Sequence, residues 1–274
     1  SAASDLYKRQ KGAALFMNER RIIQTGIDVS RYQGKIDWAR VKAGGTGFAI
    51  IKCTQGVNTV DPEFHRNMRN CADVGLPVGA YVYSKARTAF AAAEEAERAA
   101  EECAPYHLDY PIAMDFEAAQ FLAMPKKTRG AIIDAFCTRI EARDYKPMLY
   151  SIKYWLSALI PSETTRRWDV WLAQYAPRPT YSGDFTMWQR GTGNVDGIAG
   201  RVDIDICYRD YVDESPDRIV FALTSPMMQG KPVSALQAML NAAGYTASDG
   251  QRLNVDGKLL SLIHISEPTR RTPI

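Results

Sequence analysis

The spacing of apolar residues changes several times along the chain, and these changes predict strands that alternate with helices. Short apolar runs of the kind that form buried strands lie at residues 22–29, 48–53, 78–83, 110–117, 147–150, 170–174, 185–189 and 202–206. Segments with helical spacing lie at residues 61–74, 89–103 and 126–143. The last three strands have little helix between them. This order predicts a parallel, barrel-like α/β domain with an irregular finish, whose functional side chains lie at the carboxyl ends of its strands.

The strand–helix pattern covers only part of the chain, so we expect several segments of different kinds. Residues 1–20 are charged and irregular and are expected to be a leader before a main domain at residues 21–213. The periodicity lapses at residues 214–228, which we interpret as a linker. Residues 229–259 hold one amphipathic helix and are too few to fold alone. Residues 260–274 look like translated sequencing-adaptor read-through, and we exclude them from the fold.

Charge, apolar run length and the start of the chain each bear on where the protein acts and on its partners. There are 34 Lys and Arg residues against 31 Asp and Glu, a net charge of +3, so we expect no nucleic-acid partner. No apolar run approaches the ~20 residues needed to cross a bilayer, so we expect no membrane partner. No signal peptide opens the chain, and we interpret its start without Met as a trimmed or fragmentary N-terminus.

Cysteine and histidine are too scattered to predict a metal site. No two of the five cysteines form a Cys-x-x-Cys pair, and the three histidines are far apart. We therefore expect buried thiols, no metal and no cofactor. The residues concerned are Cys53, Cys71, Cys103, Cys137 and Cys207, and His65, His107 and His264.

Asp115 and Glu117 are the most informative acids of the sequence. They end the apolar run Tyr110-Pro-Ile-Ala-Met-Asp-Phe-Glu. In an extended chain they would share a face ~6.6 Å apart, with Phe116 turned into the packing. Two acids this close spread their pKa values, which gives the protonated and the charged carboxyl that a glycosidase needs. The alternative is an acid pair tied to backbone amides or to an arginine.

Further acidic residues lie at the ends of other predicted strands. Asp28 ends the first strand, and Asp203 and Asp205 share one face of a strand whose other face is apolar. Two acids on one face cost several kcal/mol unless they are paired or hydrated, so this face is expected to line a pocket. An edge strand with a solvated face is the alternative. Aromatic residues that suit the apolar faces of sugars lie near the same strand ends, namely Tyr32, Tyr81, Tyr83, Tyr150, Tyr175 and Trp188.

These residues carry a resemblance to a known family. The stretch Gly26-Ile-Asp-Val-Ser-Arg-Tyr-Gln-Gly-Lys-Ile-Asp-Trp resembles the opening signature of glycoside hydrolase family 25, the Chalaropsis-type lysozymes. Later landmarks recur in order: Gly79-Ala-Tyr-Val-Tyr-Ser, the run at 110–117, Met148-Leu-Tyr-Ser, Trp171-Leu-Ala-Gln-Tyr, Trp188-Gln and Val202-Asp-Ile-Asp. The match spans about residues 22–212. The resemblance implies a flattened barrel of about eight strands and five helices. It also implies hydrolysis of the β-1,4 bond between N-acetylmuramic acid and N-acetylglucosamine in peptidoglycan.

The resemblance assigns roles residue by residue. Glu117 matches the proton donor, Asp115 its partner in the Asp-x-Glu motif, Asp28 the acid of the first strand and Asp203 that of the last. The family usually has Asn where this chain has Asp205, which makes Asp205 a weaker rival for the role of Asp203. The aromatic residues expected to contact substrate are Tyr32, Tyr81, Tyr150, Tyr175 and Trp188.

The mechanism remains open between alternatives at this point. We expect a substrate-assisted reaction with retention of configuration, in which the acetamido group attacks the anomeric carbon and Asp115 helps. The spacing of Asp115 and Glu117 does not separate retaining from inverting enzymes, because side-chain rotation spans both carboxylate distances. One alternative function is a wall-binding protein on the same fold without turnover. Another is a phosphate-ester hydrolase whose acids hold Mg²⁺.

The segment at residues 229–259 resembles the start of a peptidoglycan-binding repeat. The matching residues are Val233, Leu236, Gln237, Leu240, Gly244, Tyr245 and Asp256-Gly257. The second helix of such a repeat is absent, so we expect an incomplete module. A helical cap on the barrel is the alternative. For the whole chain we expect a monomer, of bacterial or phage origin, that acts on peptidoglycan glycan strands. It would be secreted, or cytoplasmic until phage-induced lysis.

Overall fold

The computed structural model describes residues 21–212, 231–242, 244–247, 250–256, 258 and 265–266. Two compact units, Ser1–Glu214 and Ser215–Ile274, divide the chain, and each is considered by itself. The expected leader at residues 1–20 and the expected linker at 214–228 lie outside the described residues. So does the expected non-native tail at 260–274, apart from residues 265–266.

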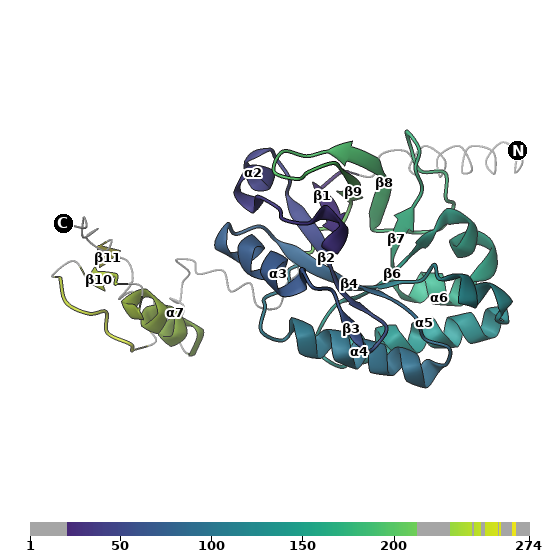
Figure 1. The fold of residues 1–274 in the computed structure, drawn as a ribbon. Coiled ribbons are helices and arrows are strands. Elements are labelled where there is room, and N and C mark those ends of the chain that lie inside the picture. Colours follow the sequence, from purple (N-terminus) through teal and green to yellow (C-terminus); the bar gives the residue numbers. More distant parts are fainter. Residues whose placement is uncertain are drawn as a thin grey trace, which may run out of the picture. The chain divides into compact units, whose positions relative to one another are not determined.

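The strands of the first unit form one sheet that closes on itself (Figure 1). They are β1 (Gln24–Val29), β2 (Phe48–Gln55), β3 (Thr59–Val60), β4 (Val78–Tyr83), β5 (Ile112–Asp115), β6 (Pro147–Ile152), β7 (Asp169–Ala173), β8 (Met187–Asn194) and β9 (Arg201–Cys207). The order is β1-β9-β8-β7-β6-β5-β4-β2-β3, and the β1–β2 pairing closes a barrel of eight strands. The barrel strands β1, β2 and β4 to β8 are parallel to their neighbours in this group. Strand β9 is antiparallel to both of its neighbours, β1 and β8. The predicted α/β barrel of about eight strands is confirmed.

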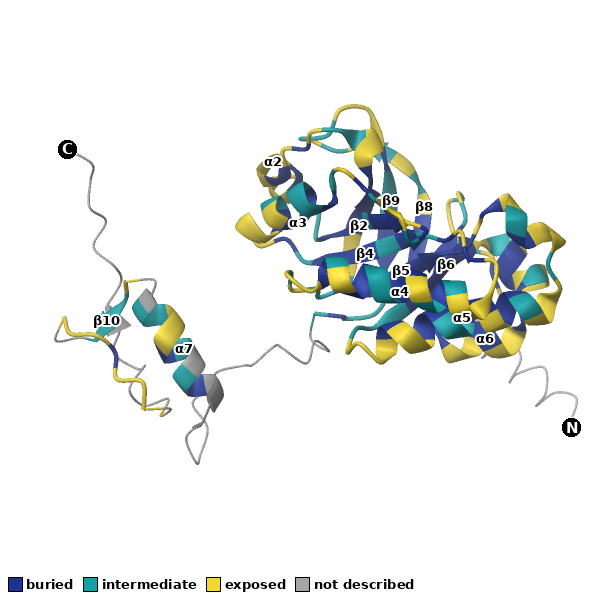
Figure 2. Ribbon diagram, turned by 60° about the horizontal axis from the view of Figure 1, so that its bottom comes forward, coloured by how far each residue is buried: buried dark blue, intermediate teal, exposed yellow. Residues whose placement is uncertain are grey.

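Helices cover the outside of this barrel. They are α2 (Trp38–Ala43), α3 (Phe64–Asp73), α4 (Ala89–Cys103), α5 (Lys126–Glu141) and α6 (Ser162–Arg167), with single turns η1 (Arg31–Gln33), η2 (Ala119–Ala123) and η3 (Trp155–Leu159). Figure 2 shows the strands as buried and the outer faces of α4 and α5 as exposed. Strand residues alternate between two apolar clusters: Ala113 packs inside the barrel, whereas Ile112 and Met114 pack under the helices.

Helix α4 shows how the sequence builds this outer layer. Thr88 accepts a hydrogen bond from the Ala91 amide at 3.1 Å and so caps the helix at the predicted residue. Small buried residues, mostly alanines, let α4 pack closely against the barrel and α5. Glu95 is the exception on this face: its carboxylate accepts from the Ser84 hydroxyl (2.7 Å) and the Lys85 amide (2.8 Å). These bonds fix the loop that follows β4, at the end of the barrel that carries the candidate acids.

The start of α3 and the region after β6 differ from the prediction. Helix α3 begins at Phe64, with Glu63 and not Asp61 at its N-cap position. The carboxylate of Asp61 accepts from the amides of Glu63 (3.0 Å) and Arg31 (3.1 Å). Asp61 therefore joins the loop after β1 to the loop before α3. The short elements η3 and α6 were not predicted. Strand β8 continues five residues beyond the predicted run, as a ribbon paired with β9.

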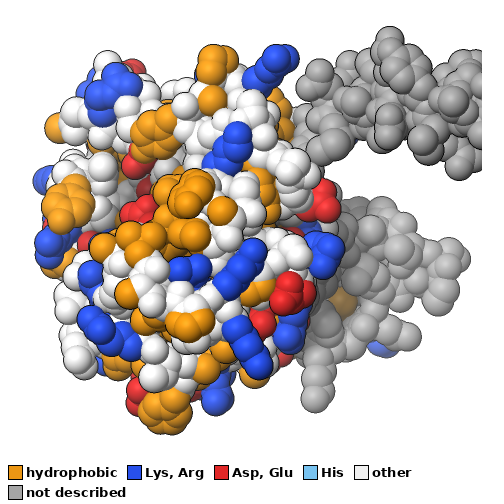
Figure 3. Space-filling view, turned by 90° about the vertical axis from the view of Figure 1, so that its right-hand side faces the viewer, with side chains coloured by type: hydrophobic (Ala, Val, Ile, Leu, Met, Phe, Trp, Pro, Cys, Tyr) orange, Lys and Arg blue, Asp and Glu red, His pale blue; other side chains and the backbone are white. Residues whose placement is uncertain are grey.

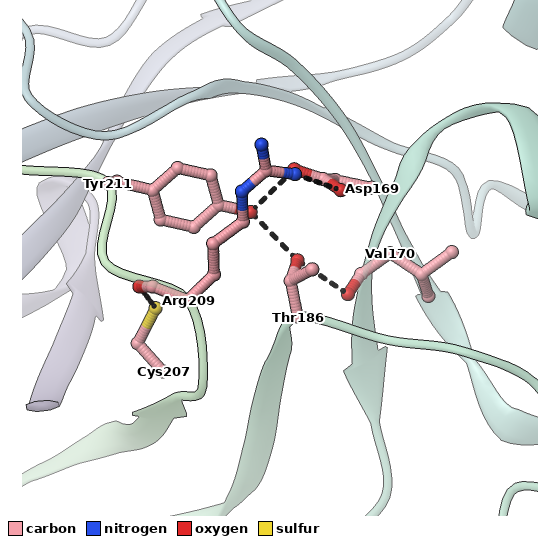
Figure 4. Close-up of polar contacts among 6 residues, drawn as sticks. All are labelled: Asp169, Val170, Thr186, Cys207, Arg209 and Tyr211. Atoms are coloured by element: carbon pink, nitrogen blue, oxygen red, sulfur yellow. Dashed lines mark hydrogen bonds and ion pairs between the residues drawn. The ribbon is translucent and has the colours of Figure 1, made fainter. Parts of the chain in front are cut away.

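A polar cluster closes the amino end of the barrel (Figure 4). The Arg209 guanidinium donates to both Asp169 carboxylate oxygens at 2.9 and 3.0 Å, and the Tyr211 hydroxyl donates to Asp169 at 2.8 Å. The hydroxyls of Tyr211 and Thr186 are 2.8 Å apart. The Tyr211 ring is fully buried and lies beside Tyr110 inside the barrel. The segment after β9 thus fills the end opposite the carboxyl ends of the parallel strands.

The described part of the second unit contains α7 (Lys231–Ala242) and two short strands, β10 (Thr246–Ala247) and β11 (Ile265–Ser266). Gln237 is buried and donates to the Asp256 carboxylate at 2.8 Å. Asn241 exchanges two hydrogen bonds with the Leu253 backbone, at 2.7 and 2.9 Å. The helix agrees with the amphipathic pattern, and the resemblance to a peptidoglycan-binding repeat stays a prediction. Among all described residues, no helix is both long and apolar enough to cross a bilayer.

The surface carries charges of both signs. On the face drawn in Figure 3, Lys and Arg side chains are interspersed with hydrophobic and acidic ones and do not gather in one basic patch. This distribution agrees with the nearly balanced count of charged residues.

Candidate active site

A cavity of about 280 Å³ opens at the carboxyl ends of the parallel barrel strands. Its lining residues are Asp28, Tyr81, Asp115, Glu117, Tyr150, Trp171, Tyr175, Gln189 and Asp203. Seven strands or the loops that follow them contribute these residues. Because β9 runs antiparallel to its neighbours, its amino-terminal half brings Asp203 to the same end as the carboxyl ends of the other strands.

The structure brings four of the predicted acids together and places the fifth behind them. Asp28, Asp115, Glu117 and Asp203 all line the cavity. Asp205 is fully buried and does not belong to the lining. The predicted pocket face of β9 is therefore present, but only its first acid reaches the cavity.

The predicted aromatic contacts divide into two groups. Tyr81, Tyr150 and Tyr175 line the cavity. Trp188 points to the outer layer, where its indole donates to the Gln174 carbonyl at 2.8 Å. Tyr32 is 77% exposed beside the Arg31 guanidinium and is not among the lining residues. The structure thus does not place Trp188 and Tyr32 at the cavity.

The end of β5 determines how Asp115 and Glu117 are presented. The strand ends at Asp115, and the Phe116 ring turns outward to stack on Phe121 with centroids 3.8 Å apart. The Phe116 backbone is held on both sides, since its amide donates to the Tyr150 carbonyl (2.9 Å) and its carbonyl accepts from the Ser151 hydroxyl (2.7 Å). With Phe116 anchored outward, Asp115 points inward and is buried, whereas Glu117 is exposed at the mouth.

A hydrogen-bonded chain holds Asp28. The Gln189 amide nitrogen donates to Asp28 Oδ2 at 2.7 Å, and the Tyr150 hydroxyl donates to Gln189 Oε1 at 3.0 Å. Tyr150 thereby determines which end of the Gln189 amide faces the acid. Asp203, the register partner of Asp28 on β9, accepts a hydrogen bond at Oδ1 from the Tyr175 hydroxyl at 2.5 Å.

Two residues that line the cavity, Gln189 and Trp171, were not among the predicted site residues. Both lie in the sequence landmarks Trp188-Gln and Trp171-Leu-Ala-Gln-Tyr. On a strand, the residue after an outward Trp188 must face inward, so period-two alternation was the signal for Gln189. Trp171 lies inside the barrel, where its indole donates to Asp205 Oδ1 at 2.8 Å.

Burial of the carboxyl groups and repulsion between their charges raise the pKa values of the acids in the cavity. Burial, with the charge of Asp203, raises the pKa of Asp28 to about 7. Burial, followed by the charge of Glu117, raises the pKa of Asp115 well above its usual range, against the opposing effect of Lys52. The pKa of Glu117 is raised by desolvation and then by the charge of Asp203. The cavity therefore offers protonated carboxyl groups near neutral pH, as acid catalysis requires.

These shifts predict that the folded protein loses stability as pH rises. A carboxyl group whose pKa is higher in the folded state binds more protons there than in the unfolded chain. Its contribution to the free energy of unfolding is complete below the pKa of the unfolded chain and is lost as the pH rises through the pKa of the folded state. For Asp28 this range runs from about 4 to about 7. We expect the Tm, followed by circular dichroism, to fall by about 3–8 °C between about pH 5 and pH 8. Asp28→Asn should flatten the slope, and a Tm that rises over this range would contradict the prediction.

No group of three or more His, Cys, Asp or Glu side chains in the described parts of the chain is arranged to hold a metal ion. The arrangement offers instead an exposed acid at the mouth, buried acids behind it and flat aromatic walls. Such a cavity can donate a proton to a bound oxygen while carboxylates stabilise a neighbouring positive charge.

Comparison with known proteins agrees with this geometry. The profile of the family described as Glycosyl hydrolases family 25 matches residues 27–198. Lysozyme M1 of Streptomyces globisporus is 30% identical over 193 residues, which cover 65% of this chain and 65% of that protein.

Solved structures show the same similarity. The bacterial lysozyme from Streptomyces coelicolor is 27% identical, with a TM-score of 0.56, over 66% of this chain and 90% of that one. The modular autolysin LytC from Streptococcus pneumoniae, solved in complex with a synthetic peptidoglycan ligand, is 25% identical with a TM-score of 0.59. The similarity to LytC covers 67% of this chain and 46% of LytC. The chain thus spans about two thirds of the Streptomyces globisporus protein and less than half of LytC.

Proposed function

The chain belongs to glycosyl hydrolase family 25, and from this premise we propose that it is a lysozyme. Its reaction would be hydrolysis of the β-1,4 bond between N-acetylmuramic acid and N-acetylglucosamine in bacterial peptidoglycan. The observation that carries the proposal is the meeting of Asp28, Asp115, Glu117 and Asp203, from three distant parts of the sequence, in one cavity. The lysozymes among its relatives support the proposal.

Glu117 is the proposed general acid. It lies at the mouth, where a glycosidic oxygen can reach it, and its raised pKa lets it arrive protonated. The proton passes to the leaving oxygen as the bond to the anomeric carbon breaks. Glu117 then takes a proton from the water that completes the reaction.

Asp115 is the proposed helper of the substrate's own acetamido group. No donor among the described residues reaches its buried oxygen Oδ1, so this oxygen is free to accept the acetamido N–H. That hydrogen bond orients the acetamido oxygen to attack the anomeric carbon and form a cyclic oxazolinium, which water opens with overall retention. The ammonium groups of Lys52 and Lys85 only partly offset the burial and the charge of Glu117 that raise the pKa of Asp115.

The remaining lining residues suit the sugar ring. Asp28 and Asp203 place negative charge beside the position where positive charge develops. Tyr81, Tyr150 and Trp171 offer flat faces, and the edge-to-face packing of Tyr150 on Trp171, with centroids 4.7 Å apart, fixes their orientation.

The product identity tests the proposal. Purified peptidoglycan digested with the full chain is expected to release fragments with N-acetylmuramic acid at the reducing end, identified by mass spectrometry after borohydride reduction. Fragments ending in N-acetylglucosamine would make the protein a glucosaminidase instead. Wall binding without any released fragment would favour the non-catalytic wall-binding protein.

The proposed substrate also decides where the protein works. Peptidoglycan glycan strands would be its partner, as LytC was solved with a peptidoglycan ligand. We propose that it acts as a monomer in the wall, either secreted or released during phage-induced lysis. The segment containing α7 would be a partial wall-binding module.

A further inference from the structure

Asp205 lies behind the cavity. With Asp203 it is one of two acidic residues on the inner face of β9. We propose that Asp205 is protonated in the working enzyme and positions Asp28 by donating a hydrogen bond to its carboxylate. The proposal deepens the proposed function and rests on it for its effect on activity. The protonation itself is a property of the folded protein and is testable without any substrate.

The strand register places the two acids side by side. In the β1–β9 pairing, Gly26 lies opposite Asp205 and Asp28 lies opposite Asp203, so Asp28 and Asp205 are diagonal neighbours on the inner face. Gly26 has no side chain to separate them. The two carboxyl groups are within hydrogen-bonding reach of each other.

The contacts of Asp205 leave one oxygen without a donor. Oδ1 accepts from the Trp171 indole at 2.8 Å. Oδ2 has no solvent contact, and no donor in the described part of the chain reaches it. A buried carboxylate oxygen in this position would cost several kcal/mol. A proton on Oδ2 removes this cost, because the resulting hydroxyl can donate to Asp28.

Asp28 is the better of the two sites for the negative charge. Its Oδ2 already accepts from Gln189, and its carboxylate borders the cavity, whereas Asp205 has no solvent contact at all. Burial, followed by the charge of Asp28, raises the pKa of Asp205 well above its usual range. The hydrogen bond from Asp205 in turn lowers the pKa of Asp28.

No cation in the described part of the chain faces the Asp28–Asp205 pair. Among the described residues, the other ionisable groups that face the pair are Asp203 and Cys207 on β9, Asp115 and Glu117 at and after the end of β5, Tyr81 on β4, Tyr150 on β6 and Tyr175 after β7. None of these groups can carry a positive charge. Asp205 is therefore a positioning residue: it cannot touch a substrate and acts through Asp28, which also accepts a hydrogen bond from Gln189.

Infrared spectroscopy of the resting, full-length protein tests the protonation directly. A protonated carboxyl group shows a C=O stretch that a carboxylate lacks. In the difference spectrum between wild type and Asp205→Asn near pH 7, we expect this band to be lost. Asp73→Asn, at an exposed position, serves as the matched control. A spectrum without loss of the band would overturn the proposal, since Asp205 would then be charged or the proton would reside on Asp28.

Two substitutions with opposite chemistry test the positioning. Asparagine can accept from Trp171 through Oδ1 and donate to Asp28 through Nδ2, as the protonated acid does. Leucine has a similar size but can do neither. We expect Asp205→Asn to lower kcat/KM less than about tenfold and Asp205→Leu to lower it more than about 100-fold. Equal loss in both variants would overturn the proposal.

The pH profile separates this role from a purely structural one. The acidic limb of kcat/KM follows ionisation of Asp28 and its neighbours. If Asp205 is neutral, Asp205→Asn removes no charge and the limb stays in place. If Asp205 is charged, its removal shifts the limb to lower pH by about one unit, which would contradict the proposal. Should the wild type lack hydrolytic activity, the proposed function fails while the infrared result still decides the protonation.

Discussion

Glu117→Gln is expected to lower peptidoglycan hydrolysis by about 10³–10⁴-fold and to leave binding to insoluble walls intact. Glutamine keeps the size of the side chain but has no proton to give to the leaving oxygen. Because Glu117 is exposed just after β5, and no hydrogen bond within the described part of the chain depends on its carboxyl group, the fold should not change. Release of reducing ends measures the loss, and co-sedimentation with walls measures binding.

Glu101→Gln provides a matched control for this variant, since Glu101 is also exposed but lies on α4. Its activity should equal that of the wild type. An activity of Glu117→Gln close to that of the wild type would show that another group is the proton donor. Because the pKa of Glu117 is raised, the alkaline limb of the wild-type profile should lie above that of an ordinary glutamate.

Asp115→Asn is expected to produce the second large effect, a loss of about 10²–10³-fold in kcat. The variant cannot supply a carboxylate to the acetamido N–H. Its Tm near pH 8 should not fall, because the substitution removes an acid that folding buries without donors to Oδ1. Loss of activity with an unchanged or higher Tm would separate a catalytic role from a role in folding.

The substrate supplies the matching test for Asp115. Walls whose muramic acid lacks the acetyl group should be poor substrates for the wild type, and the difference between wild type and Asp115→Asn should largely disappear on them. Proton NMR of the first product from acetylated substrate should show the retained anomer. Initial appearance of the inverted anomer would contradict the substrate-assisted reaction.

The convergence of the acids was predictable because it depends on strand ends. Apolar runs identified the barrel strands, and in a parallel barrel their carboxyl ends meet on one side. Asp28, Asp115 and Glu117 lie at such ends, and the structure places them in one cavity. For β9, alternation predicted the shared inner face of Asp203 and Asp205, but not their depth. That depth follows from the antiparallel direction of β9, which puts Asp203 nearer the mouth.

Motif position was a poorer guide than alternation for the aromatic residues. Trp188 lies in a landmark of the family, but its place on β8 turns it outward and leaves Gln189 inside. Tyr32 follows β1 in the short turn η1, where no strand periodicity fixes its direction. The missed elements α2, α6 and η3 are only five or six residues long, too short for helical spacing to be recognised.

The position of β9 between β1 and β8 has a consequence for the synthesis of the protein. The last barrel strand in the sequence, β9, also carries Asp203 and Asp205, so the barrel and its set of carboxyl groups are completed together. A nascent chain that has not yet emerged from the ribosome beyond Cys207 has an open sheet and an incomplete cavity. We therefore expect the producing cell to meet an active hydrolase only after this whole unit has been translated.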